Sequence, residues 1–454
     1  MVGGLCVDTR RTARQTLERQ LISATRPPAQ EASPRRAAPS ATPPPRTVTE
    51  GRSRLRRRMP WAWLSVVGAA GLISVMTAPG QTAGLSVFTD PLIGELGVSR
   101  TAISVSYLIS TLLGAIVQPV IGRALDRWGT RPVTAALGAA FAVILFALGF
   151  VGEIGGLTAG FVGVRMVGQG ALTLAATTAV ARTIHHRRGL ALGVTGAIGS
   201  AGISLAPIFL ERLIAAVGIH AAWRWEAAAV ALLVIPLAFV FARRSRAAPV
   251  ATTTAQVAVQ QASWTLSEAM RSGMFWVIAA SLATSGMLTT GLAFHQIAIL
   301  GEQGLSPLEA ATNFLPQAIT GILATLLTGS LVDWVSPKLF VMFSMATLAG
   351  ALLMLPLVAP GWSAVLYGLV LGAAGGSLRG MEAATYVRYY GTAHIGSIRG
   401  VAMSISLAST AFGPVALSLG FDVTGGFSVP AMLLAVVPLI VAGITVFVRS
   451  PRRP

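Results

Sequence analysis

The sequence predicts an all-α integral membrane protein with twelve transmembrane helices, arranged in two pseudo-symmetric bundles of six. The 454 residues are 54% hydrophobic and only 11% charged, whereas ordinary soluble domains are about one quarter charged. Apolar runs of about 20 residues recur along the chain, as membrane-spanning helices require. A charge-dense loop around Asp126 has a partial copy around Asp333, 207 residues later, which indicates two related halves.

Each expected transmembrane helix is an apolar run between loops that contain charged residues, glycine or proline. At a rise of 1.5 Å per residue, about 20 residues cross roughly 30 Å of hydrocarbon. The expected spans are residues 62–88, 101–122, 132–151, 156–182, 188–210, 223–243, 274–299, 307–331, 338–357, 362–388, 397–419 and 428–448.

The spans divide the chain into an N-terminal six-helix bundle (59–245), a central cytoplasmic loop (246–271) and a C-terminal six-helix bundle (272–454). Arginine and lysine gather in alternate loops, and the intervening loops carry mainly aspartate and glutamate. The positive-inside rule therefore predicts that both termini are cytoplasmic, which agrees with an even number of spans. We expect a monomeric, multi-pass protein of the plasma (inner) membrane, with the lipid bilayer as its surroundings.

Residues 1–58 form a basic tail rich in proline, serine, threonine and alanine, without an apolar run long enough to bury. We expect this tail to be disordered. It lacks the hydrophobic core and the cleavage site of a signal peptide. Met59 directly precedes the first apolar run and follows three arginines. The sequence leaves open whether translation starts at Met59 or whether residues 1–58 are a cytoplasmic tail.

Charge and composition argue against several other classes of protein. The formal net charge is +18, but the bases lie in the tail and in short loops, where they indicate membrane topology rather than nucleic-acid binding. Cys6 is the only cysteine and the five histidines are scattered, so we expect no metal site and no cofactor. The sequence has no Gly-x4-Gly-Lys-Ser/Thr loop for ATP. We therefore do not expect an enzyme.

The loop between the second and third expected spans has the spacing Gly-x3-Asp-Arg-x-Gly-x-Arg over residues 122–131. Its glycines permit a sharp turn, its aspartate can meet an arginine or a helix N-terminus, and its arginines favour the cytoplasmic side. The copy at residues 329–338 lacks the central arginine and the second glycine. The two loops predict a gating hinge in each half. The expected gating residues are Gly122, Asp126, Arg127, Gly129, Arg131, Gly329 and Asp333.

These loops resemble the signature loop of the major facilitator superfamily of secondary transporters. Three further stretches resemble the bacterial monocarboxylate transporter-like (oxalate/formate antiporter-like) branch of that superfamily; they are residues 80–100, 186–202 and 390–400. The resemblance implies a transporter whose two halves rock to expose a central site to either side of the membrane. It also implies that a proton or an exchanged anion drives the movement.

Three polar residues of the tenth expected span are the leading candidates for a substrate site. Arg379 lies nine residues before Arg388, roughly 13 Å from the helix end, at a depth where a base costs about 2.5–3.5 kcal/mol. Glu382 and Tyr386 can share a helix face with it. In one interpretation, Arg379 and Glu382 form a fixed pair that locks the bundle. In the other, Arg379 binds a substrate carboxylate and Glu382 takes up a proton.

Further candidates lie in other spans. Arg165, followed by Gln169-Gly170, resembles the fourth-helix motif of the superfamily, which implies proton coupling or helix packing. His295 is interpreted either as a gate or interface residue or as a proton carrier. Pro79-Gly80 interrupts the first span, which requires that neighbours or a cavity satisfy the freed backbone. The remaining candidates for lining the substrate pathway are Gln81, Tyr107, Asn313 and Gln317.

The sequence departs from the branch at one point that bears on the substrate. Relatives that carry monocarboxylates or oxalate use a base in the eighth helix, and some use a lysine in the eleventh. Here the eighth span has no lysine or arginine, and the eleventh has none after Arg399. The leading hypothesis is still a transporter of a small organic anion, with Arg379 in the anion-binding role. The alternatives are proton-coupled drug efflux and, in another class, a non-transporting membrane sensor.

Overall fold

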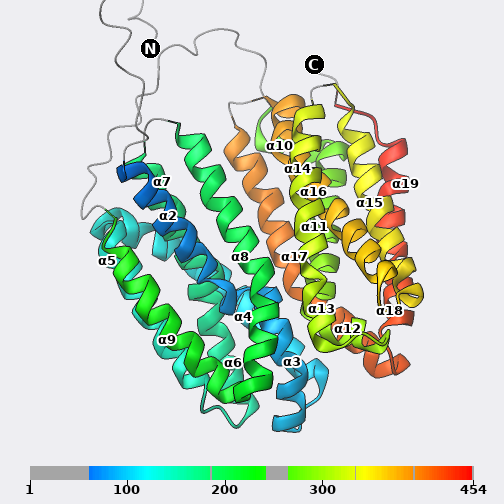
Figure 1. Cartoon of the computed structure of the whole chain (residues 1–454). Coiled ribbons are helices and arrows are strands. Elements are labelled where there is room, and N and C mark those ends of the chain that lie inside the picture. The colour runs from blue at the N-terminus through cyan, green and yellow to red at the C-terminus, as the bar shows by residue number, and fades with distance from the viewer. Residues whose placement is uncertain (1–60, 185–186, 242–263, 333, 392–393, 452–454) are drawn as a thin grey trace, which may run out of the picture. The chain divides into compact units, whose positions relative to one another are not determined.

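The computed structural model describes residues 61–184, 187–241, 264–332, 334–391 and 394–451 (Figure 1). The regular secondary structure of these residues is helical, and twelve of the helical segments are long and apolar enough to span a membrane. The spans are Trp63–Leu96, Arg100–Trp128, Thr130–Leu148, Ile154–Thr183, Gly189–Val217, Ile219–Ala238, Gly273–Phe294, Pro307–Leu331, Pro337–Leu357, Trp362–Glu382, Ser397–Thr424 and Ser428–Phe447. Each overlaps one expected span, so the predicted all-α fold with twelve transmembrane helices is confirmed.

Several spans consist of more than one helix. The N-terminal half contains α2 (Trp61–Val75), η1 (Ala78–Gly80), α3 (Thr82–Leu96), α4 (Arg100–Trp128), α5 (Thr130–Leu148), α6 (Ile154–Val164), η2 (Arg165–Leu172), α7 (Thr173–Thr183), α8 (Arg188–Val217) and α9 (Ile219–Ala238). The C-terminal half contains α10 (Leu266–Arg271), α11 (Gly273–Phe294), α12 (Gln296–Glu302), α13 (Pro307–Thr312), α14 (Phe314–Leu331), α15 (Pro337–Met354), η4 (Leu355–Leu357), α16 (Trp362–Tyr390), α17 (Ile395–Thr424), α18 (Ser428–Leu434) and α19 (Val436–Phe447).

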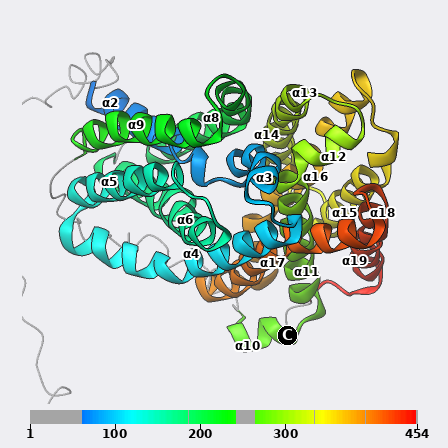
Figure 2. The ribbon, with the colours of Figure 1, turned by 90° about the horizontal axis from the view of Figure 1, so that it is seen from below.

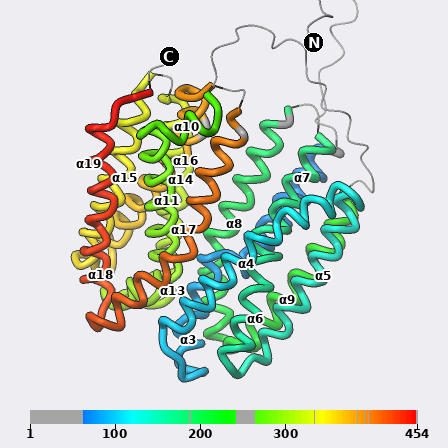
Figure 3. The backbone as a smooth tube through the Cα atoms, turned by 180° about the vertical axis from the view of Figure 1, so that it is seen from behind, coloured from blue at the N-terminus to red at the C-terminus, as the bar shows by residue number. Residues whose placement is uncertain are grey.

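Each half has its own core of buried apolar side chains. The halves meet where α4 lies against α17, α3 against α11, and α8 against α13 and α14; these neighbours can be followed from below and from behind (Figures 2 and 3). The predicted tail, 1–58, and most of the predicted central loop, 246–271, lie outside the described residues. The cytoplasmic location of the termini stays a prediction.

The first span is broken as the sequence predicts. Helix α2 ends at Val75, the short 3-10 helix η1 contains Pro79 and Gly80, and α3 begins at Thr82. A Cβ atom at Gly80 would lie 2.3 Å from the carbonyl oxygen of Val164 and 2.8 Å from the Cα atom of Gly168. Only glycine therefore allows the break in the first span to pack against the backbone of the fourth.

The fourth span contains an irregularity that its sequence does not reveal. Between the α-helices α6 and α7, residues Arg165–Leu172 form a π-helix, η2. Such widened turns are rare and frequently occur at functional sites. Gly168 within η2 faces Gly80, and a Cβ atom there would lie 2.7 Å from the ring of Phe141. The widened segment therefore starts at Arg165 and is held tightly by the first and third spans.

A stripe of glycines joins α14 and α16 in the C-terminal half. Gly372, Gly376 and Gly380 recur every four residues on α16, and a Cβ atom at any of them would lie 2.2–2.4 Å from a carbonyl oxygen of α14. Small residues at this spacing let membrane helices approach backbone to backbone. The position of Arg379, on the same helix, is therefore fixed by close packing of its neighbours.

The central loop ends in the short helix α10, which is outside the membrane spans. The amide and hydroxyl of Thr265 donate to Glu268 Oε2 at 2.8 and 2.9 Å. These hydrogen bonds, led by the backbone one, hold the pKa of Glu268 below its usual range. This capping box fixes the start of the helix that leads into the seventh span.

Candidate functional site

Arg165 connects three spans of the N-terminal half. Its Nη1 atom donates to the carbonyl oxygen of Gly80 at 3.2 Å and lies 3.4 Å from Thr82 Oγ1. Its guanidinium lies over the ring of Tyr107 at 4.5 Å, and the Tyr107 hydroxyl is 2.7 Å from Thr82 Oγ1. Arg165 therefore satisfies a carbonyl group freed by the break in the first span, which supports the packing interpretation for this edge of its side chain.

Arg165 also lines a pocket between the two halves. Nε and Nη2 have no hydrogen-bond partner in the described part of the chain. The pocket has a volume of about 210 Å³. It is lined by Thr111, Gly114, Ala115, Gln118, Arg165, Gln169, Gly170 and Leu407. Leu407 belongs to α17, so the C-terminal half contributes one wall.

The structure does not bring Arg379 and Glu382 together as a fixed pair, so that interpretation is wrong. Arg399 on α17 donates from Nη2 to Glu382 Oε1 at 3.2 Å. Arg379 forms no ion pair with a described residue and is exposed, although it lies well within α16. Its Nη2 atom lies 3.1 Å from where a Cβ atom of Gly321 would be. Arg379 thus lies across α14 in space left by a glycine.

Tyr386 is buried on the side of α16 that faces other aromatic residues. Its ring centroid lies 6.4 Å from that of Phe275 and 6.2 Å from that of Tyr390. Its hydroxyl has no hydrogen-bond partner among the residues described. Tyr386 and the exposed Arg379 therefore occupy different environments, although both belong to α16.

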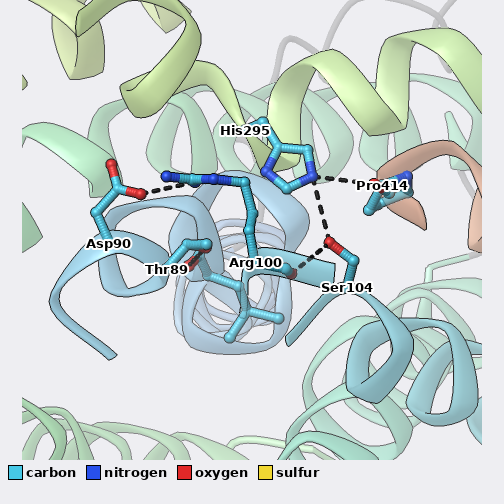
Figure 4. A network of polar contacts seen from close by, with 7 residues as sticks. Thr89, Asp90, Arg100, Ser104, His295 and Pro414 are labelled. Carbon is cyan, nitrogen blue, oxygen red and sulfur yellow. Dashed lines mark hydrogen bonds and ion pairs between the residues drawn. The ribbon is translucent and has the colours of Figure 1, made fainter. Parts of the chain in front are cut away.

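His295 joins the two halves (Figure 4). Its Nε2 atom lies 3.0 Å from the carbonyl oxygen of Pro414 and 3.3 Å from Ser104 Oγ. Because a carbonyl oxygen only accepts, Nε2 carries the proton and donates. Arg100, one turn before Ser104, forms an ion pair with Asp90 at 2.7 Å. His295 is 1% exposed, which supports the interface interpretation over that of a proton carrier.

The same end of the bundle contains two further contacts between the halves. Thr101 donates to Asp422 Oδ2 at 2.6 Å, and the Arg100 guanidinium lies 5.2 and 5.4 Å from the ring centroids of Phe421 and Phe427. We call Asp90, Arg100, Thr101, Ser104, His295, Pro414 and Asp422 the interhalf network. Asp90 belongs to α3 and His295 directly precedes α12, and these two helices lie at the end of the bundle opposite to the C-terminal end of the chain (Figure 1).

The amide side chains predicted to line the pathway are committed to hydrogen bonds within their own halves. Gln317 donates to Gln296 Oε1 at 2.8 Å and to Asn313 Oδ1 at 3.1 Å. Asn313 donates to the carbonyl oxygen of Ala364 at 2.6 Å. Gln81 donates to Thr77 Oγ1 at 3.1 Å. A substrate would have to use their remaining donors and acceptors.

Both signature loops are held by an arginine from a distant helix end. Arg182, at the end of α7, donates to the carbonyl oxygen of Leu125 at 2.9 Å and forms an ion pair with Asp126. Arg388, at the end of α16, donates to the carbonyl oxygens of Val332 and Val335 at 2.9 and 3.0 Å. Since Leu125 precedes Asp126 as Val332 precedes Asp333, the two halves repeat the same contact. Asp333 itself lies outside the described residues.

The other expected gating residues serve different local purposes. Gly129 has φ +88° between α4 and α5, a conformation that favours glycine. Arg127 lies over the Trp128 ring at 5.9 Å, and Arg131 over the Phe239 ring at 4.4 Å. Added Cβ atoms would meet nothing within 4 Å at Gly122, and a carbonyl oxygen at an ordinary 3.7 Å at Gly329. In this structure, a larger residue could therefore replace Gly122 or Gly329 without a clash at its Cβ atom.

Glu226 was absent from the sequence-based set of candidates. It lies in α9, is 8% exposed and forms no ion pair with a residue that the structure describes. The sequence alone could have identified Glu226 as a candidate, because it lies inside the expected span 223–243 and ionisable residues inside membrane spans are rare. The roles of Arg399, Arg182 and Gln118 had no such signal, because they depend on contacts between helices.

Among the described residues, no group of three or more histidine, cysteine, aspartate or glutamate side chains is arranged to hold a metal ion. The charged groups within the spans instead include ion pairs, such as Glu382–Arg399 and Asp90–Arg100, and arginines without an ion pair to a described residue, such as Arg165 and Arg379. Such groups can bind ions or protons but provide no evident catalytic set.

Comparisons with known proteins agree with this architecture. The family model described as Major Facilitator Superfamily matches residues 70–414. The oxalate:formate antiporter of Oxalobacter formigenes is 25% identical over 219 residues, which cover 48% of this chain and 50% of that relative. The chain thus matches about half the length of this curated relative.

Two solved structures share the fold. A bacterial homologue of the human lysosomal transporter Spinster, in an inward-facing and unoccupied conformation, gives a TM-score of 0.68 at 16% identity, covering 86% of this chain and 98% of that chain. Its inward-facing and occupied counterpart gives 0.67 at 15% identity with the same coverage. Because the family model covers most of the chain, the resemblance noted in the sequence is confirmed at the level of the superfamily, and the chain belongs to the major facilitator superfamily as a multi-pass membrane transporter.

Proposed function

We propose that this transporter moves a small organic anion of the monocarboxylate kind across the plasma membrane by alternating access, coupled to protons or to exchange of a second anion. The observation that carries the proposal is a pair of arginines within the spans, one in each half. Neither Arg165 nor Arg379 forms an ion pair with a described residue. A cation inside a membrane protein requires compensation, and a bound carboxylate would supply it.

Two further observations support an anionic cargo. The curated relative that matches half of this chain is named as an antiporter of oxalate and formate. The pocket beside Arg165, at about 210 Å³, is smaller than the roughly 300–1,000 Å³ typical of sites for drug-sized ligands. A small anion therefore suits the site better than the large apolar cargo of a drug efflux transporter.

The proposed cycle uses the interhalf network and the signature loops. With cytoplasmic termini, the interhalf network lies at the outer face, and we infer that the structure represents an inward-facing state. To open outward, the contacts Thr101–Asp422 and Ser104–His295 have to break. The arginine contacts of the two signature loops would hold each half rigid while it moves, so that opening occurs between halves rather than within them.

Proton coupling is proposed to involve Glu382. Its carboxylate accepts from Arg399 across α16 and α17, and both side chains are partly buried at 16% and 34% exposure. Protonation of Glu382 would remove the charge that holds Arg399 and would change how these two helices pack. A proton taken up here could therefore be linked to movement of the C-terminal half.

The proposal is tested by counterflow in proteoliposomes that contain the purified transporter. Labelled formate, oxalate, acetate, lactate and pyruvate are offered to vesicles preloaded with the same unlabelled anion, with and without a pH gradient. Accumulation of at least one anion supports the function. Extrusion of cationic dyes without anion counterflow would identify a drug efflux transporter. Absence of any flux, with the protein correctly inserted, would favour the non-transporting sensor.

A further inference from the structure

The guanidinium of Arg165 has two different edges. On one edge, Nη1 donates to Gly80 and contacts Thr82. On the other edge, the Nε–H and Nη2–H bonds point the same way, and neither donor has a partner among the described residues. The side chain is only 2% exposed. Two parallel N–H donors form the fork that binds a carboxylate through two hydrogen bonds.

A second unpartnered donor lines the same pocket. Thr111 on α4 is 4% exposed, and its hydroxyl has no hydrogen-bond partner in the described part of the chain. Hydroxyls in helices commonly donate to a carbonyl oxygen of the preceding turn, as those of Ser104, Ser106 and Ser110 do on the same helix. The Thr111 hydroxyl departs from this pattern, so it is free to donate to a ligand.

The charge of the pocket is uncompensated. Arg165 is the only charged residue among those that line it, and the acidic residues of α4 and α17, Asp126 and Asp422, pair with other groups at the far ends of those helices. The Gln118 amide is fixed by donation to the carbonyl oxygens of Gly114 and Met166 at 3.2 and 3.3 Å. The pocket therefore presents donors and a positive charge, and no carboxylate of the described residues lines it.

The donors are held in place before any ligand binds. Arg165 opens the π-helix η2, and its ring contact with Tyr107 and its hydrogen bond to Gly80 restrain the guanidinium. Gly168 and Gly80 lie so close that neither tolerates a side chain. A preorganised site loses little conformational entropy on binding.

We propose that the Nε–Nη2 fork of Arg165 and the hydroxyl of Thr111 bind one carboxylate group of the transported anion. The inference rests on the proposed function and deepens it, because it assigns an anion-binding site to the N-terminal half, separate from Arg379. Since Leu407 of α17 forms part of the pocket wall, movement of the C-terminal half would change the shape of the site. The site takes a carboxylate of about the size of formate, oxalate or lactate.

The test uses the purified full-length transporter and measures the Kd for labelled formate and oxalate. Thr111→Val removes the hydroxyl without breaking a hydrogen bond that the described residues make, and the Kd should rise about threefold to tenfold. Arg165→Lys keeps the charge but removes the fork, and the Kd should rise tenfold or more. Thr195→Val is the matched control, because the Thr195 hydroxyl is buried on α8 and donates to Ala191 at 2.9 Å; its Kd should not change.

Three results would overturn the assignment. An unchanged Kd in Thr111→Val and Arg165→Lys, with transport intact in the wild type, would reject this site and leave the proposed function standing. Equally effective competition by chloride would show a halide site rather than a carboxylate site. Absence of carboxylate binding and counterflow in the wild type would reject the proposed function and this site together. Gel filtration and thermal unfolding establish whether each variant is folded. If Arg165→Lys does not fold, the Kd of Thr111→Val alone decides whether this carboxylate site exists.

Discussion

Glu382 accepts a hydrogen bond from Arg399 at 3.2 Å across the boundary between α16 and α17. This contact leaves Arg379, three residues earlier on α16, without an acidic partner among the residues described. The spacing of Arg379 and Glu382 suggested an ion pair within α16. The structure instead has an ion pair between α16 and α17, Glu382–Arg399, and an arginine, Arg379, without an ion pair to a described residue. In the proposed function, the two groups therefore act independently: Glu382 toward protons and Arg379 toward an anion.

Glu382→Gln should flatten the pH dependence of uptake while exchange of anions persists. Glutamine keeps the size and a hydrogen-bond acceptor for Arg399 but cannot take up a proton. The measurement is initial uptake across a series of external pH values, beside exchange at equal pH. Glu268→Gln, which changes a carboxylate outside the spans, should keep the wild-type profile. An unaltered pH profile in Glu382→Gln would remove Glu382 from proton coupling.

Arg379→Ala should weaken anion binding by roughly tenfold or more, because a hydrogen bond to a charged group contributes about 1.5–3 kcal/mol. Truncation breaks no ion pair among the described residues, so the helices should still pack. Binding of labelled oxalate to purified protein checks the prediction. If affinity is retained and only thermal stability falls, Arg379 is a structural residue of α14 and α16.

Asp126→Asn should slow transport by about tenfold without preventing membrane insertion. The substitution removes the ion pair with Arg182 but leaves the hydrogen bond from Arg182 to the Leu125 carbonyl. Counterflow rates and the amount of inserted protein are measured together. Glu153→Gln, at an exposed position between the third and fourth spans, serves as the control. Normal transport by Asp126→Asn would contradict the gating role of this loop.

Crosslinking Thr101→Cys to Asp422→Cys should arrest transport. The two side chains are in contact across the halves, at 2.6 Å, and the proposed outward opening separates them. Because Cys6 is the only native cysteine, the two cysteines are introduced into a Cys6→Ala variant. A short bifunctional thiol reagent with a reducible linker then crosslinks them, and reduction of the linker should restore transport. Each single-cysteine variant treated in the same way is the control. Full transport by the crosslinked protein would show that this contact need not open.

Gly372→Ala should lower the free energy of unfolding by about 1–3 kcal/mol, as overpacking does. Its Cβ atom would lie 2.2 Å from the carbonyl oxygen of Gln317, so α14 and α16 would have to separate. Gly350→Ala on α15 is the matched control, because nothing lies within 4 Å of the added atom. Unfolding of both variants in detergent is compared with the wild type. Equal stability of the two variants would show that the glycine stripe does not determine this packing.

The sequence alone determined the features that depend on composition and local order. The length of the apolar runs predicted twelve helices, because the thickness of the bilayer sets the length of a span. The paired loops around Asp126 and Asp333 predicted two halves, and the comparisons confirmed the superfamily. The break at Pro79-Gly80 was also predictable, because proline cannot donate the backbone hydrogen bond that a continuous helix needs.

Only the tertiary structure decided how the ionisable groups are partnered. The pairing of Glu382 with Arg399, the pocket that Arg165 and Thr111 both line, and the contact of His295 with the opposite half all depend on residues of different helices. Sequence spacing reveals which residues share one helix face, but it contains no direct record of which faces of separate helices meet. That choice is made by close packing, as the glycines between α14 and α16 show, and it determines which charges stay available for a substrate.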